Sequence, residues 1–106
     1  MSAPPKPPKE RGDGSAAKGV RAVVGIVNRR GLHARAAAKF VKVAEQFVAE
    51  IEVAKDDIVV PGTSIMGLMV LAAAPGSQLE IRARGREARA ALAALVALVE
   101  RGFDEN

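Results

Sequence analysis

The side chains best suited to chemistry lie in one stretch, NRRGLHARAAAKFV, which covers residues 28–41. This stretch contains the only histidine of the chain, His33. Arg29 and Arg30 precede it and Arg35 follows it. Histidine is the side chain whose charge changes nearest neutral pH, and its neutral ring is a nucleophile. The first question is therefore what the surrounding residues would let this ring do.

The backbone around His33 favours an anion. The alanine-rich segment predicts a helix that begins at residue 34, and Gly31 can supply the left-handed turn that leads into it. The first N–H groups of such a helix have no intrahelical acceptor, and the helix dipole adds positive charge at the same end. Together with the arginines, this charge favours the neutral ring over the imidazolium. A phosphoryl group on the ring would meet N–H donors and a guanidinium together, so the pattern predicts a phosphoryl acceptor.

Basic residues continue along the predicted helix. Arg35, Lys39 and Lys42 recur at helical spacing and so share one face. Residues 29–42 contain five lysines and arginines and no acidic residue. This face predicts a docking surface for an acidic partner.

Other chemistries at His33 have less support. A histidine at a helix start is often only a cap or a loop residue, so a structural role stays open as an alternative. A zinc site is disfavoured more firmly, because one histidine and no cysteine leave too few ligands. The sequence contains no G-x-S-x-G motif, so a hydrolase of the Ser-His-Asp type is disfavoured as well. The residues alone thus leave two interpretations open, a phosphoryl acceptor that needs no metal and a histidine with only a structural role.

The composition fits one small domain in a reducing compartment. A chain of 106 residues can bury one core, and aromatic residues make up only 3%, so this core must consist mainly of Ala, Val, Leu and Ile. The sequence has no cysteine and no signal-peptide pattern. Its apolar runs fall far short of the roughly 20 residues that span a bilayer. We expect a cytoplasmic protein without a membrane segment.

The net charge of +4 is divided unevenly. Residues 1–18 carry four basic and two acidic side chains, which leaves 12 basic and 10 acidic ones, a net +2, for the other 88 residues. A nearly balanced domain without Trp or Tyr does not favour nucleic-acid binding. Binding of nucleic acid through the basic tail is a separate alternative.

Hydrophobic periodicity and chain breakers predict a tail followed by one domain. Residues 1–18 are rich in proline and have little to bury, which predicts disorder, and the domain covers residues 19–106. The expected elements are a strand over 20–27, a helix over 34–48, a hairpin over 50–60, a short helix, a strand over 78–84, and a helix with an apolar stripe over 88–99. The short helix is expected to be capped by Thr63 or Ser64 and to end at Pro75-Gly76. The last helix is expected to end at Gly102 with an apolar contact from Phe103. The first strand is expected to be too buried to alternate, and the first helix to bury Val48. The order β-α-β-β-α-β-α favours an α+β open-faced sandwich, a four-stranded antiparallel sheet with three helices on one face.

The second predicted helix divides into a core side and an open side. Its core residues are expected to be Ile65, Leu68 and Leu71. The residues expected to stay exposed are Met66, Met69 and Val70. Flexible methionines suit a surface that meets several partners, although such residues often only fill a core.

Two motifs, taken together with the order of elements, resemble a known family. GLHARAAAKFV at residues 31–41 and SIMGLMVLAAAPGS at residues 64–77 resemble the histidine-containing phosphocarrier protein, HPr, of the bacterial phosphoenolpyruvate-dependent phosphotransferase system. The resemblance covers residues 20–103 and leaves out the tail. The ending GFDEN resembles the nitrogen-related branch, NPr, rather than the sugar-uptake branch, which stays open as an alternative.

The resemblance implies a carrier rather than an enzyme. Such a carrier accepts a phosphoryl group from enzyme I on Nδ1 of His33 and passes it to an EIIA-type protein, here in nitrogen or stress regulation. Arg35 would assist the transfer, and Ser64 would be a regulatory site for a serine kinase. We expect a monomer that needs no cofactor, no metal, no nucleic acid and no membrane. The residues expected to bind partners are Arg30, Ala34, Ala38, Lys39, Lys42, Ile65, Met66, Met69 and Val70.

Two residues depart from the family pattern. Ala36 stands where a proline usually follows the arginine, so the first helical turn loses a rigid residue that needs no N–H partner. Arg30 replaces the small polar residue that commonly precedes the glycine, which adds attraction for anions. The other class of function left open is an α+β module that binds an anionic metabolite or an acidic protein, with His33 incidental.

Overall fold

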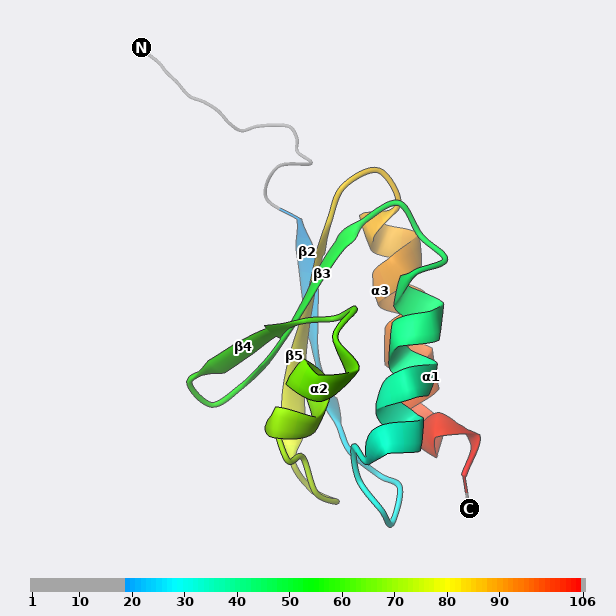
Figure 1. Ribbon diagram of the computed structural model, residues 1–106. Helices are drawn as coiled ribbons and strands as arrows, with labels where there is room; N and C mark the ends of the chain where they lie inside the picture. The colour runs from blue at the N-terminus through cyan, green and yellow to red at the C-terminus, as the bar shows by residue number, and fades with distance from the viewer. Residues whose placement is uncertain (1–18, 106) are drawn as a thin grey trace.

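The computed structural model describes residues 19–105. Its strands form one antiparallel sheet in the order β2-β5-β3-β4. Helices cover one face of this sheet and leave the other face open, so the predicted α+β open-faced sandwich is confirmed (Figure 1). The elements in chain order are β2 (Val20–Gly25), α1 (Ala34–Ala44), β3 (Glu50–Lys55), β4 (Ile58–Pro61), α2 (Ile65–Val70), β5 (Gln78–Arg84), α3 (Ala88–Glu100) and the 3₁₀ turn η1 (Gly102–Asp104). The tail predicted at residues 1–18 lies outside the described part of the chain.

Strand β5 forms the centre of the sheet and shows the alternation that its sequence predicts. Leu79, Ile81 and Ala83 are buried, whereas Glu80 and Arg82 lie on the open face. Because β5 pairs with β2 on one side and with β3 on the other, its inward side chains anchor the helices over the middle of the sheet.

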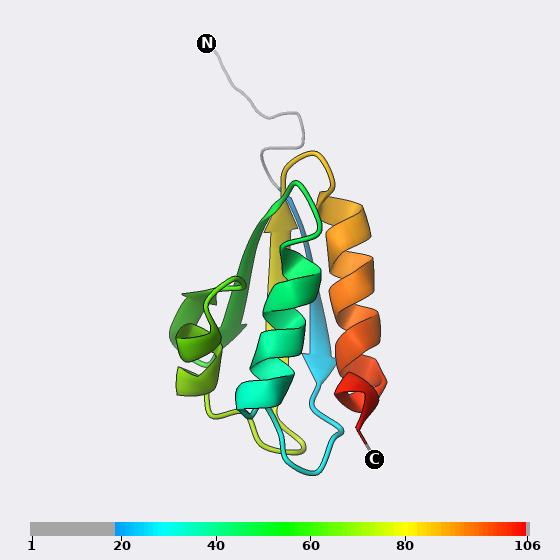
Figure 2. The ribbon, with the colours of Figure 1, turned by 45° about the vertical axis from the view of Figure 1, so that its right-hand side comes forward.

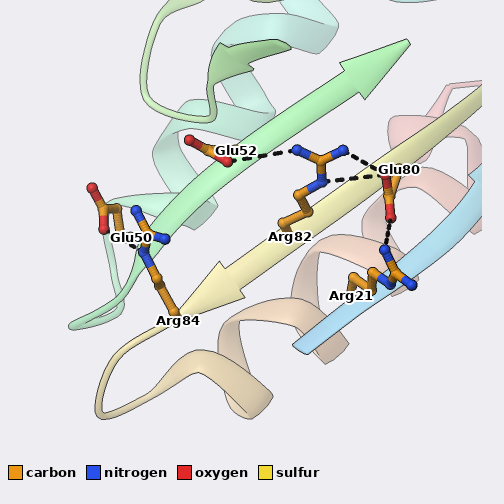
Figure 3. Close-up of polar contacts among 6 residues, drawn as sticks. All are labelled: Arg21, Glu50, Glu52, Glu80, Arg82 and Arg84. Atoms are coloured by element: carbon orange, nitrogen blue, oxygen red, sulfur yellow. Dashed lines mark hydrogen bonds and ion pairs between the residues drawn. The ribbon is translucent and has the colours of Figure 1, made fainter. Parts of the chain in front are cut away.

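The open face of the sheet carries a ladder of alternating charges (Figure 3). Arg82 donates to Glu80 on its own strand at 2.8 Å and lies 3.8 Å from Glu52 of β3. The register also places Glu50 opposite Arg84, so opposite charges face each other across the strands. The hydrogen bond from Arg84 holds the pKa of Glu50 below its ordinary value, and the hydrogen bond from Arg82 does the same for the pKa of Glu80.

The core lies between the sheet and the pair of helices α1 and α3, which run side by side (Figure 2). Ala37 of α1 and Ala91 of α3 are completely buried. The largest core side chains are Phe40 of α1 and Phe103 of η1, both fully buried. The expected aliphatic and alanine-rich core is therefore confirmed, with two of the three phenylalanines at its centre.

Two predicted helices are shorter than the sequence suggested. α1 ends at Ala44. The N–H of Val48 donates to the side chain of Glu87, and the carbonyl of Val48 accepts the N–H of Glu87, just before α3. The chain must leave the helix for Val48 to reach Glu87. Val48 is 61% exposed, so its predicted burial is wrong. α2 ends at Val70, because Ala72 adopts the left-handed φ of +49°, well before Pro75.

The prediction for the first strand needs two corrections. β2 ends at Gly25, although Ile26 still exchanges hydrogen bonds with the turn at residues 76–77. Arg21 and Val23 are exposed, so the strand alternates where continuous burial was expected. The physical reason is that no helix covers the second face of the sheet. Within residues 19–105, no helix is both long enough and apolar enough to cross a membrane.

Candidate functional site

A tight loop connects β2 to His33. Gly31 has a φ of +67°, and a Cβ atom at this position would overlap the carbonyl oxygen of Ala73. That carbonyl accepts the N–H of the buried Leu32 at 2.9 Å. The predicted left-handed turn at Gly31 is confirmed, and the close approach to Ala73 fixes the loop against the segment that follows α2.

His33 is the N-cap residue of α1. Its carbonyl accepts the first helical hydrogen bond, from the N–H of Ala37 at 2.8 Å, and its Nδ1 atom accepts the N–H of Arg35 at 3.2 Å. Nδ1 therefore faces the N-terminal end of the helix, where anions are favoured. The side chain is 14% exposed, so the ring is largely covered while its edge still reaches the surface.

The other ring nitrogen contacts a carboxylate that sequence analysis did not identify. Nε2 of His33 lies against Oε2 of Glu105, and the second oxygen of Glu105 accepts the amide of Asn28 at 2.9 Å. Asn28 also donates to the carbonyl of Gly31 at 2.8 Å. The hydrogen bond from Asn28, followed by smaller effects of His33 and Arg30, holds the pKa of Glu105 below its ordinary value. This carboxylate offsets part of the positive charge that the arginines bring to the site.

The C-terminal segment reaches the site because it leaves α3 through left-handed backbone. Gly102, Phe103 and Asp104 have φ values of +67°, +57° and +62°. Phe103 is buried, and its carbonyl accepts Nζ of Lys39 from α1 at 2.8 Å. The segment therefore lies beside the start of α1 (Figure 1). The predicted left-handed helix end at Gly102 and the apolar packing of Phe103 are both confirmed.

The predicted basic residues divide into two groups. Arg29, Arg30, Arg35 and Lys42 are exposed, as a docking surface requires. Lys39 is half-buried, because its ammonium group binds the C-terminal segment. In the described structure Lys39 therefore joins α1 to η1.

Ser64 caps α2, which resolves the choice between Thr63 and Ser64. Its hydroxyl oxygen accepts the N–H of Gly67 at 2.9 Å. The side chain is half-buried, whereas Thr63 is exposed. Ser64 thus has a structural role that accounts for its position without any regulatory function.

The second helix exposes more apolar surface than expected. Leu68 and Leu71 are buried as predicted, but Ile65 is 39% exposed, so its assignment to the core is wrong. A helix of six residues packs only a narrow stripe against the core, and Ile65 lies in its first turn, outside that stripe. The exposed apolar residues of α2 are Ile65, Met66, Met69 and Val70.

The remaining predicted partner residues lie on α1, close to α2. Ala34 and Ala38 are exposed on α1, and α1 contacts α2 directly. In the part of the chain that the structure describes, no three His, Cys, Asp or Glu side chains are placed to hold a metal ion. The site is therefore a histidine at a helix start, beside an open patch of apolar and basic side chains.

Comparison with known proteins identifies the family. Residues 20–101 match the family model described as the PTS HPr component phosphorylation site. The chain belongs to the HPr family. Members of this family are phosphocarriers of the phosphotransferase system rather than enzymes, as the resemblance implied. HPr proteins interact with enzyme I and with EIIA-type components of that system.

Individual HPr relatives agree with this assignment. The phosphocarrier protein HPr of Neisseria meningitidis is 47% identical over 81 residues, which cover 76% of this chain and 91% of that protein. The phosphocarrier protein NPr of Klebsiella oxytoca is 39% identical over 88 residues, which cover 82% and 98%. The crystal structure of an HPr from Thermoanaerobacter tengcongensis superposes with a TM-score of 0.79 at 40% identity, covering 82% of this chain and 98% of that one.

Proposed function

We propose that this HPr-family protein accepts a phosphoryl group from enzyme I on Nδ1 of His33 and passes it to an EIIA-type protein. The observation that carries the proposal is the position of Nδ1, which faces the N–H of Arg35 at the start of α1. An incoming phosphoryl group at Nδ1 would meet that N–H and the dipole of an 11-residue helix.

Arg35 supplies the charge that a phosphoryl group needs in transfer. Its backbone N–H donates to Nδ1 of His33, the proposed acceptor atom. Its guanidinium is exposed and can bind an anion from the solvent side. Ala36, in place of the family proline, is completely buried in a regular first turn. The helix therefore starts regularly at Ala34 without the proline.

We assign partner docking to a set of residues on α1, α2 and the loop before α1, the docking face. It combines exposed apolar groups of α2 with exposed residues of α1, which suits partners that bring both apolar and acidic groups. Lys39 contributes only its half-buried stem, since its ammonium binds Phe103. The residues of the docking face are Arg30, Ala34, Ala38, Lys39, Lys42, Ile65, Met66, Met69 and Val70.

Ser64 is proposed as a regulatory phosphorylation site. It stands at the start of α2, directly before Ile65 and Met66 of the docking face. A phosphate there would sit favourably at the helix N-terminus but would bring about two negative charges beside apolar groups that must be desolvated on docking. Phosphorylation by a serine kinase would therefore weaken partner binding and leave the fold intact.

The branch of the family is the finer part of the proposal. We place the protein in a cytoplasmic phosphorelay of nitrogen or stress regulation, since its ending GFDEN resembles NPr and its match to an NPr runs over 88 residues. The sugar-uptake branch is the second candidate, because relatives named HPr reach 47% identity against 40% for those named NPr.

The test of the acceptor uses phosphoenolpyruvate labelled in its phosphate. With enzyme I present, the protein should take up label that is stable in alkali and lost in acid, as a phosphoramidate requires. His33→Ala should take up none. Equal labelling of His33→Ala would exclude His33 as the acceptor, and no labelling of either protein would favour the alternative of a ligand-binding module.

The branch is tested by competition between donors and between acceptors. Phosphorylation is followed with enzyme I of the nitrogen type and of the sugar type, and then transfer to EIIA proteins of each type. Faster transfer with the nitrogen pair supports the proposed branch. Faster transfer with the sugar pair assigns the protein to uptake.

A further inference from the structure

The two nitrogens of His33 face partners of opposite kind. Nδ1 accepts an N–H from Arg35 at 3.2 Å, so it must hold a lone pair. Nε2 contacts the carboxylate of Glu105, which accepts hydrogen bonds, so Nε2 must hold the proton. Two independent contacts therefore require the same tautomer of the neutral ring.

We propose that Glu105, held in place by Asn28, is a positioning residue for phosphoryl transfer. It fixes the Nε2–H tautomer of His33 and thereby keeps Nδ1 unprotonated, so that its lone pair can attack once it gives up the N–H of Arg35. This inference rests on the proposed function, because it assumes that His33 is the acceptor. In general, the hydrogen bond at one imidazole nitrogen decides which form the other nitrogen takes.

Asn28 orients the carboxylate through a rigid amide. It is 95% buried, with a relative exposure of 5%, and its Nδ2 group donates to Glu105 at 2.9 Å and to the carbonyl of Gly31 at 2.8 Å. Both partners are acceptors, so the amide cannot turn over without losing both bonds. Its Oδ1 atom is buried and accepts no hydrogen bond from residues 19–105, which costs free energy. Turning the amide over would not remove this cost, because Nδ2 would then be buried without a partner in the same place. The donor geometry toward Glu105 is therefore set by the loop that also carries His33.

The fold, and not a loose chain end, brings Glu105 to the ring. Phe103 is fully buried two residues earlier, and its carbonyl is bound by Lys39 of α1. Gly102 provides the left-handed turn that directs the segment back toward the loop. The carboxylate thus binds Asn28 and His33, while packing of Phe103 and the hydrogen bond from Lys39 fix the backbone two residues before it. The side chain of Glu105 keeps 19% exposure.

The chemistry of transfer explains why a carboxylate is useful at Nε2. The Nδ1 lone pair attacks phosphorus and forms the N–P bond, while the bond from phosphorus to the donor protein breaks and its electron pair leaves with the donor. The ring keeps its Nε2 proton and becomes positively charged. Glu105 stabilises this charge as it develops. In the delivery step the N–P bond breaks, its electron pair returns to Nδ1, and no proton has to move in either direction.

The tautomer is tested by NMR on protein labelled with ¹⁵N in the imidazole. In the unphosphorylated wild-type protein, at a pH where the ring is neutral, the proton should reside on Nε2. Glu105→Gln keeps the size of the side chain and removes its charge, and it should produce a mixture of the two tautomers. Asp104→Asn is the matched control, because it removes a neighbouring carboxylate that binds Arg101 instead of His33. It should leave the wild-type tautomer unchanged.

Transfer is measured on the same three proteins with enzyme I and labelled phosphoenolpyruvate. Glu105→Gln should accept the phosphoryl group at least about 10-fold more slowly, the lower end of the effect that follows when a carboxylate that orients a metal-bound histidine is removed. Asp104→Asn should match the wild-type rate. An unchanged tautomer or an unchanged rate in Glu105→Gln would overturn the role of Glu105. Absence of labelling in the wild type would instead overturn the proposed function, while the NMR result would still decide whether Glu105 sets the tautomer.

Discussion

At the scale of single residues, the loop before His33 depends on a glycine for both its backbone conformation and its close packing. Gly31 combines a left-handed φ of +67° with direct contact to the backbone of Ala73. Gly76 also has a positive φ, of +91°, but nothing lies within 4 Å of the place where its Cβ would be. An alanine at Gly76 would therefore meet only the cost of the left-handed backbone, whereas an alanine at Gly31 would also clash with Ala73.

We expect Gly31→Ala to destabilise the protein more than Gly76→Ala does. Each alanine must bear the conformational cost of about 1–2 kcal/mol, and only Gly31→Ala must also push Ala73 away. Urea denaturation of both variants gives the two free energies of unfolding. Gly31→Ala should in addition slow phosphorylation, because the displaced loop carries His33. Equal losses of stability in the two variants would show that contact with Ala73 does not constrain the loop.

At this scale the sequence predicted the residues around His33 but not Glu105, which contacts the same ring. His33, Arg35 and Gly31 lie within five residues, so local spacing alone placed them together at a helix start. Glu105 is 72 positions from His33, and nothing in the spacing indicates that it returns to the ring. Its approach depends on left-handed φ angles at Phe103 and Asp104. Phenylalanine rarely adopts this conformation, so the identity of residue 103 does not predict it.

At the scale of secondary-structure elements, α2 depends on one side chain for its first turn. The hydroxyl of Ser64 binds the N–H of Gly67, and Gly67 is itself a poor helix former in a helix of six residues. Thr63, its neighbour in sequence, is exposed and does not cap the helix.

Ser64→Ala should lower the free energy of unfolding by about 1 kcal/mol, the usual value of an N-cap hydrogen bond. Ser64→Asp should keep most of the stability, because aspartate is also a good cap, yet it should bind EIIA-type proteins more weakly. Thr63→Ala is the control and should leave stability unchanged. Urea denaturation gives the stabilities, and titration calorimetry gives the affinities. Tight binding by Ser64→Asp would contradict the proposed regulatory role of this position.

The charge ladder of the open sheet face makes stability depend on pH. The pKa of Glu80 is lowered, first by its hydrogen bond from Arg82 and also by Arg21 of β2, which binds it at 3.3 Å. A carboxylate with a lower pKa in the folded state stabilises the fold above its unfolded pKa. That contribution is lost as pH falls through the folded value.

Glu80→Gln should therefore flatten the loss of stability below about pH 4.5, the ordinary pKa of glutamate. Unfolding by urea is followed for wild type and variant over the acid range. Arg82→Gln should flatten the same region, because it removes the main partner of Glu80. Wild type and Glu80→Gln losing stability in parallel would show that the ladder contributes nothing to acid sensitivity.

Periodicity predicted the type and order of the strands and of α1, α2 and α3, together with the bounds of β5, but not the residues at which β2, α1 and α2 end. The alternation of β5 and the stripe of α3 are local patterns, and the structure keeps both. α1 ends four residues early because Val48 binds Glu87, a contact between positions 39 apart. The C-terminal end of α1 thus depends on Glu87, a residue of another element that lies too far along the sequence for a local pattern to include it.

At the scale of the whole molecule, one aromatic side chain joins stability to the site. Phe103 is completely buried in the core, and the residues that follow it carry Glu105 to His33. The core and the site are therefore coupled through the last few residues of the described chain.

Phe103→Ala should cost about 3–5 kcal/mol of unfolding free energy, the usual range for a buried phenylalanine. It should also release Glu105, so the tautomer preference of His33 should weaken in the molecules that remain folded. Phe47→Ala is the control, because Phe47 is only half-buried and lies near the other end of α1. It should cost less and should leave His33 unaffected. Calorimetric melting and imidazole NMR give the two readouts.

The two ends of the described chain lie at opposite ends of the sheet (Figure 1). Strand β2 carries the chain about 20 Å from Val20 to the loop of His33, whereas residue 105 touches the ring itself. A purification tag or a surface linker placed before residue 19 leaves the histidine free for its partners. The same addition after residue 106 would crowd the carboxylate of Glu105, so assays on proteins tagged there would underestimate the rate of transfer.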